Sequence, residues 1–294
     1  MRRLIIFLYL LFIVFIPLRL EAVNLTFRVE PSKIRLNVPA GSSQAGTIKV
    51  YSQSGDKTKI KAYLEDWLYT KIQDGSKDFF PAKTTPFSCV DWITFSPSEF
   101  IIPPYGVQNV NYVVRVPPEA EGGRFAVMFF ETAFLRGIEE STYLQDEGVR
   151  SGAALNVRLG VLFYTDVKDT AKLLAELSNF SVLKDPKNNY LLVSVDFKNV
   201  GNTDIGAGGT FHIMDNKGVV YARGEFKNVY TLSGDGAKLT AVWKETLPKG
   251  KYDLVLTLDL GKYREEISRG TILVKEAKIE IGDNGAVVRV GQLK

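Results

Sequence analysis

The sequence contains very few of the residues on which most active sites depend. Among 294 residues there is one cysteine and one histidine. A single Cys excludes a disulfide framework and a cysteine-based zinc cluster, and a single His excludes every multi-histidine metal site. The 25 Gly and 12 Pro follow no three-residue repeat, which excludes collagen. Hydrophobic residues (45%) and charged residues (24%) occur at levels ordinary for a folded protein. We therefore expect no catalytic residue, no metal and no cofactor, and we do not expect an enzyme.

The N-terminus has the pattern of an export signal. Arg2 and Arg3 precede a 15-residue apolar run over residues 4–18, and Ala22 suits the last position before cleavage. A membrane-spanning helix needs about 20 apolar residues, so this run is short for an anchor. We predict a cleaved signal peptide over residues 1–22, no membrane span after cleavage, and a periplasmic or otherwise extracytoplasmic protein. An uncleaved anchor is the alternative.

The charge balance argues against a nucleic-acid partner. Residues 1–22 hold three of the 37 Lys and Arg and one of the 33 Asp and Glu, so the remaining chain carries a net charge of +2. It contains no long basic run, which nucleic-acid binding would favour. We expect no nucleic acid as partner.

Alternation of apolar and polar residues dominates the rest of the chain and predicts an all-β protein. The longest alternating series consists of Leu155, Val157, Leu159, Val161 and Phe163. A polar stretch over residues 166–172 separates two series of short strands. We predict two immunoglobulin-like antiparallel β-sandwich domains in tandem, over residues 23–167 and 168–294. Asn284-Gly285 suits a tight turn and predicts a last hairpin within residues 279–290, whereas residues 171–177 have weak helical character.

Some segments and residues do not fit a strand pattern or invite a chemical interpretation. Residues 71–88 and 135–152 are polar and are expected to form long loops, either functional or disordered insertions. His212 lies inside a predicted strand with no sign of a triad around it, so it is interpreted as a sheet-surface or sheet-edge residue. Cys89, close to Trp92, is interpreted as a buried, inert thiol, with an intermolecular disulfide as the alternative.

Four stretches of the first domain resemble the N-terminal domain of periplasmic pilus-assembly chaperones of the PapD type. They are residues 31–36 (PSKIRL), residues 92–110 with WITFSP, FIIPP and QNV, residues 124–131 (RFAVMFFE) and residues 157–164, which end in LFY. These matches are diffuse and cover about half of the chain. The second domain is similar to a generic immunoglobulin-like module, because residues 196–202 (DFKNVGN) resemble a strand end found in adhesion modules.

The resemblance implies a function in which a strand is donated to an incomplete partner subunit. It implies that Leu155, Val157 and Leu159 are the side chains offered to the partner, although they could equally pack the domain's own core. It also implies a clamp of two basic residues for the partner's terminal carboxylate. Lys33 matches the first clamp residue, and Arg158 is the nearest basic residue to the second, which falls at Gly160 or Val161 in this sequence.

Three hypotheses of function result from the sequence. The first is a non-enzymatic extracytoplasmic chaperone or assembly factor that binds surface or pilus subunits of the cell envelope by β-strand donation. The second is a structural or adhesive immunoglobulin-like tandem at the cell surface. A carbohydrate-acting enzyme built on a sandwich is a distant third.

Overall fold

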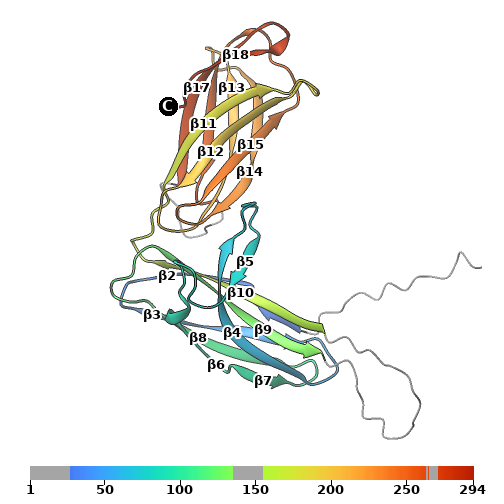
Figure 1. The fold of residues 1–294 in the computed structure, drawn as a ribbon, viewed down its shortest axis with the longest axis vertical. Helices are drawn as coiled ribbons and strands as arrows, with labels where there is room; N and C mark the ends of the chain where they lie inside the picture. Colours follow the sequence, from blue (N-terminus) through green and yellow to red (C-terminus); the bar gives the residue numbers. More distant parts are fainter. Residues whose placement is uncertain (1–26, 135–154, 263, 265–270) are drawn as a thin grey trace, which may run out of the picture.

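The computed structural model describes residues 27–134, 155–262, 264 and 271–294, without the side chains of residues 133, 134, 155 and 156. The predicted signal peptide and most of the predicted loop at 135–152 lie outside the described residues. The chain forms two immunoglobulin-like β-sandwiches in tandem, so the predicted fold class is confirmed (Figure 1). In the described part of the chain no helix is long and apolar enough to cross a bilayer.

The first sandwich consists of two sheets. Its first sheet has the order β1-β3-β8-β6, and its second has the order β2-β10-β9-β4-β5, with β7 also paired to β4. The strands are β1 (Phe27–Glu30), β2 (Lys33–Val38), β3 (Ser43–Ser52), β4 (Thr58–Tyr69), β5 (Lys77–Phe80), β6 (Ile93–Ser96), β7 (Glu99–Ile102), β8 (Val107–Arg115), β9 (Gly123–Phe134) and β10 (Leu155–Val167). A single turn of 3-10 helix, η1 (Val90–Trp92), precedes β6.

The second sandwich repeats this two-sheet plan. A three-stranded sheet, β11-β12-β15, packs on a five-stranded sheet, β14-β13-β16-β17-β18. The strands are β11 (Ala175–Lys184), β12 (Leu191–Asn199), β13 (Ile205–Met214), β14 (Val220–Thr231), β15 (Gly236–Trp243), β16 (Gly250–Asp259), β17 (Ile272–Ile281) and β18 (Val287–Val290), with η2 (Asp283–Gly285) before the last strand. The expected final hairpin is present as β17–β18, and Asn284 and Gly285 both have positive φ, as a tight hairpin turn requires.

Two local expectations are wrong. The weak helical character of residues 171–177 gives no helix, since β11 begins at Ala175 and pairs with β12. Residues 71–88 are not one continuous loop, because β5 pairs with the end of β4 and forms a hairpin. In both cases pairing with the neighbouring strand along the chain outweighs the local sequence preference.

Strand alternation places one side-chain row of each strand in the core. In β10, Val161 and Phe163 are fully buried in the core of the first sandwich. The opposite face of the same sheet carries a second apolar cluster around Trp67, Phe125 and Tyr164, to which Leu232 of the second sandwich contributes. Since Phe163 on the core face and Tyr164 on the opposite face are both buried, both sides of the C-terminal half of β10 are covered.

Candidate functional site: an open strand edge and the junction cleft

Strand β10 has two different halves. Over its whole length it pairs antiparallel with β9, from Leu155 opposite Phe134 to Asp166 opposite Gly123. It pairs with β2 only from Leu162 onward. Within the described residues, positions 155–161 therefore have a neighbouring strand on one side only. We call the other side of β10 over residues 155–161 the rim.

The direction of the backbone groups at the rim follows from the ladder. The N–H of Leu162 donates to the carbonyl of Ser32, beside β2, at 3.1 Å, and the N–H of Val167 donates to Gly122, beside β9, at 2.9 Å. Successive residues of a strand point their N–H and C=O groups to opposite sides. Since the ladder with β9 contains no bulge, Asn156, Arg158 and Gly160 direct theirs to the rim.

The side chains of the predicted donor row lie on the core face. Val157 and Leu159 are partly buried and pack against the core of the first sandwich, on the same face as Val161 and Phe163. The backbone of Leu155 continues the strand, but its side chain lies outside the described residues. Along β10, the burial of the core-facing side chains thus decreases from Phe163 and Val161 to Leu159 and Val157.

A cleft of about 560 Å³ lies at the junction of the two sandwiches, where the rim ends. Strands of the first sandwich and residues of the second line it together: Ser32, Lys33, Arg35, Tyr69, Asp74, Gly75, Lys77, Gly160, Leu162, Tyr164, Asp204, Gly206, Tyr230 and Arg264. Four of these residues are basic and two are acidic. We call this hollow the junction cleft.

A buried ionic network forms the floor of the junction cleft and joins the two sandwiches. Nη1 and Nη2 of Arg35 lie 3.0 and 2.7 Å from the carboxylate oxygens of Asp204, and Nη1 also lies 3.1 Å from Asp166. Arg264 donates to Asp166 at 2.8 Å, to the hydroxyl of Thr203 at 2.8 Å and to Asp204. Since Arg35 and Asp166 belong to the first sandwich and the other three to the second, the network is an interdomain contact.

The network favours the charged forms of Asp204 and Arg35 in spite of their burial. Burial by itself raises the pKa of the Asp204 carboxyl, but Arg264 and Arg35 outweigh it and hold that pKa below its usual value. Burial lowers the pKa of Arg35, yet Asp204 and Asp166 raise it above the usual value. The Nε groups of Arg35 and Arg264 are buried and have no hydrogen-bond partner among the described residues. The two arginines of the network thus each keep one buried donor that the described residues do not satisfy.

Two lysines, Lys33 and Lys77, also line the junction cleft. The ammonium of Lys33 lies 5.1 Å from the ring centre of Tyr164, and that of Lys77 lies 5.4 Å from Trp67 and 5.1 Å from Tyr69. Burial lowers the pKa of Lys77, and the positive charge of Lys33 lowers it further. An anion bound near Lys77 would favour the charged form of this lysine, so the site is suited to an anion.

Of the two predicted clamp residues, the structure places only Lys33 in the junction cleft. Arg158 lies on the same face of β10 as Gly160, as its spacing predicts, but its guanidinium lies 4.1 Å from the ring centre of Phe129. It also donates to both carboxylate oxygens of Glu65 at 3.2 Å. Arg158 does not line the cleft.

Most residues of the cleft carry no signal in the sequence. Lys77 falls in a segment expected to be a loop, Asp204 stands among the glycines of residues 201–209, and no motif surrounds Asp166 or Arg264. Only the pairing of distant strands brings these residues together.

Cys89 is fully buried, and burial raises its pKa to about 12, in accord with its interpretation as an unreactive thiol.

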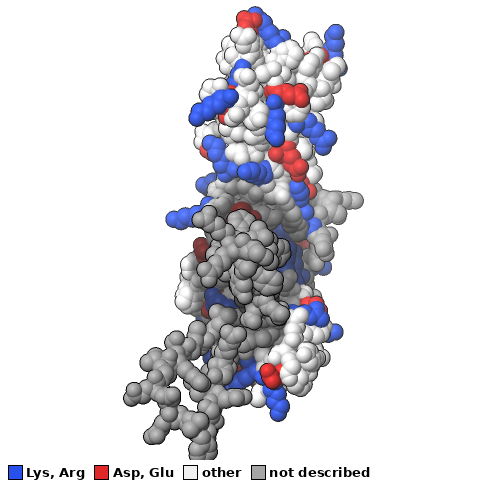
Figure 2. Space-filling model, turned by 90° about the vertical axis from the view of Figure 1, so that its right-hand side faces the viewer, with Lys and Arg blue, Asp and Glu red and all other residues white. Residues whose placement is uncertain are grey.

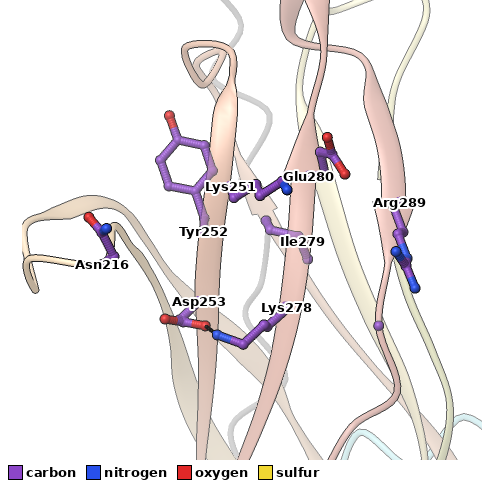
Figure 3. A pocket seen from close by; sticks show the side chains of 9 residues that line it. Asn216, Lys251, Tyr252, Asp253, Lys278, Ile279, Glu280 and Arg289 are labelled. Atoms are coloured by element: carbon purple, nitrogen blue, oxygen red, sulfur yellow. Dashed lines mark hydrogen bonds and ion pairs between the residues drawn. The ribbon is translucent and has the colours of Figure 1, made fainter.

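A second hollow, of about 370 Å³, lies on the outer face of the second sandwich (Figure 3). Charges of opposite sign are paired across its strands, and Lys278 donates to Asp253 at 2.7 Å. Basic and acidic side chains are also mixed on the face of the second sandwich that Figure 2 shows. The hollow is lined by three basic and two acidic residues, against four and two in the junction cleft, so it is less suited to an anion.

Fimbrial chaperones are among the solved structures that are similar to this chain. No family model and no curated protein matches it. Many of its structural neighbours are PapD-like fimbrial chaperones. A chaperone–tip adhesin complex of CFA/I fimbriae is 13% identical with a TM-score of 0.47, over 86% of this chain and 98% of that one. The class 5 fimbriae chaperone CfaA is 12% identical with a TM-score of 0.44, over 85% and 98%. The CupB2 chaperone of Pseudomonas aeruginosa is 10% identical with a TM-score of 0.36, over 83% and 97%.

Proposed function

We propose that this chain is a non-enzymatic extracytoplasmic chaperone or assembly factor that binds subunits of pili or of the cell surface by β-strand donation. The observation that carries the proposal is the rim, where β10 has, among the residues that the structure describes, a neighbouring strand on one side only. An unpaired strand edge is a template for a strand of another chain. The export signal predicted over residues 1–22 supports the location.

The two faces of β10 have different roles in this proposal. The backbone groups of Asn156, Arg158 and Gly160 bond to the partner's strand and set its register. Leu155, Val157 and Leu159 provide the apolar row that the incomplete subunit covers. The decrease in burial of this row toward the rim supports the assignment, because it leaves apolar surface for a partner to bury.

The junction cleft receives the anionic end of the partner's strand. Lys33 keeps the role predicted for it, and Lys77 takes the second position, because Arg158 is bonded to Glu65. A chain-terminal carboxylate is the anion that a strand lying along the rim would bring to this place, and ammonium groups bind it with charge-assisted hydrogen bonds.

A proline substitution tests the rim without disturbing the core. Arg158→Pro removes one N–H that faces the rim and leaves the ladder with β9 complete, and proline is tolerated on an edge strand. Arg158→Ala is the matched control, because it removes the same side chain and keeps the N–H. We expect wild type and Arg158→Ala to copurify with a β-rich surface subunit from the native envelope, and Arg158→Pro to lose it at unchanged melting temperature.

The opposite outcome is equally clear. If folded Arg158→Pro retains the subunit at the wild-type level, the rim is not the binding edge. The cleft is tested separately with peptides that copy the captured subunit's C-terminus. A free carboxylate should bind more tightly than the amide to wild type, and this preference should disappear in Lys77→Met.

A further inference from the structure

The linker side of the junction is tied closely to the second sandwich. The chain leaves β10 at Val167 and enters β11 at Ala175. Between them, the N–H of Lys172 donates to the side chain of Asn202 at 2.7 Å, and the amide of Asn202 donates to the carbonyl of Thr170 at 3.0 Å. These contacts lie within a few residues of one another along the linker. They can therefore act as a hinge, but they only weakly resist rotation of one sandwich relative to the other about an axis that passes through them.

A second contact lies on the other side of the junction. The β4–β5 hairpin extends from the first sandwich toward the second, on the side away from the linker (Figure 1). At its tip the carbonyl of Gln73 accepts the N–H of Tyr230 at 2.9 Å, and the Gln73 side chain donates to the carbonyl of Gly236. Below the tip, the rings of Tyr69 and Tyr230 have centres 5.8 Å apart. The hairpin therefore contacts both β14 and β15.

The tip of the hairpin has a fixed shape of its own. The N–H of Thr70 donates to the carbonyl of Ser76 at 3.0 Å, and the side chain of Asp74 accepts the N–H of Ser76 at 2.9 Å. Gly75 has φ +99°, which glycine adopts readily, and a Cβ there would lie 3.2 Å from the ring of Tyr230. A tip held by its own bonds transmits force instead of yielding.

We infer that the β4–β5 hairpin is a strut that holds the two sandwiches at one angle and thereby fixes the width of the junction cleft. The linker contacts define the hinge, and the hairpin contact lies off that line, where it opposes rotation most effectively. The inference does not depend on what binds in the cleft. It predicts that the hairpin controls the interdomain angle even when the ionic network of Arg35, Asp204 and Arg264 is complete.

Distance measurements between spin labels test the strut. Lys49 on β3 and Lys238 on β15 are exposed, one in each sandwich, and can be replaced by labelled cysteines. Cys89 is buried and does not compete for the label. In the test variant, residues 71–75 are replaced by a two-residue Asn-Gly turn, which removes the hydrogen bonds of Gln73 to Tyr230 and Gly236. Ile72→Ala is the matched control, since Ile72 lies on the same tip with 76% of its surface exposed.

We expect one narrow distance distribution for wild type and Ile72→Ala, and about a twofold broader one for the shortened hairpin. Tyr230→Ala provides a second variant that leaves the first sandwich untouched, and it should broaden the distribution in the same direction. If the folded shortened variant or Tyr230→Ala gives the wild-type width and mean, the ionic network and the linker fix the angle by themselves and the strut is refuted.

Discussion

Substitution of Asp204 by asparagine should uncouple the two sandwiches. Asp204 accepts from Arg35 at 2.7 and 3.0 Å and from Arg264, and only 6% of its side chain is exposed. Removing one partner of a buried ion pair costs about 3–5 kcal/mol. Because asparagine keeps the shape and one acceptor oxygen, we expect about 3 kcal/mol of lost unfolding free energy. For a chain of this size that loss lowers the melting temperature by roughly 6–12 °C.

Scanning calorimetry measures this loss, and it should also show the melting of the sandwiches separating into two transitions. Asp253→Asn is the control, because it breaks an ion pair with Lys278 whose side chains are 38% and 86% exposed. An exposed pair of this kind contributes about 1 kcal/mol or less. If Asp204→Asn lowers the melting temperature no more than Asp253→Asn does, the network does not stabilise the junction.

Three further predictions use the same structure. Burial raises the pKa of Asp204, but Arg264 and Arg35 hold that pKa below its unfolded value of about 3.9. The contribution of Asp204 to stability is therefore present above about pH 4 and is lost as the pH falls through the folded pKa. Acid titration of unfolding should therefore be steeper for wild type than for Asp204→Asn, and equal slopes would contradict this. Gly160→Ala places a Cβ 2.9 Å from Val127 and 3.0 Å from Phe129, so urea unfolding should show a loss of about 1–3 kcal/mol; an unchanged midpoint would mean that the neighbours move freely. Cys89 should react with a thiol reagent only as fast as the first sandwich opens, because its thiol is buried and its pKa is about 12; rapid labelling of the folded chain would show an open path to it.

The sandwiches were predictable because each strand carries its own evidence. The alternation over residues 155–163 follows from a core face that must be apolar at every second position, and Val161 and Phe163 are indeed fully buried. The final hairpin was predictable for a similar reason, since Asn284 and Gly285 adopt the positive φ that the turn needs.

The junction cleft was not predictable in this way. Asp166, Asp204 and Arg264 meet across distances of about 40 to 100 positions along the chain, and no periodic pattern marks a contact of that kind. Lys33 was found through a resemblance of residues 31–36, whereas the second cation was sought on β10 by the same resemblance. The structure does have a second lysine in the cleft, Lys77, but it lies on the β4–β5 hairpin, a segment that the sequence alone indicated as a loop.

The first two strands of the chain belong to different sheets, since β1 pairs with β3 and β2 pairs with β10. This change of sheet limits how much of β10 another chain can use. Since β2 lies alongside β10 from Leu162 to Val167, an added segment can pair only with positions before Leu162, and seven of these, residues 155–161, lie within the described residues. At about 3.3 Å per residue these seven positions extend roughly 23 Å. A bound peptide that is lengthened toward Leu162 must bend away where it meets Lys33, so residues added at that end beyond the rim should not raise its affinity.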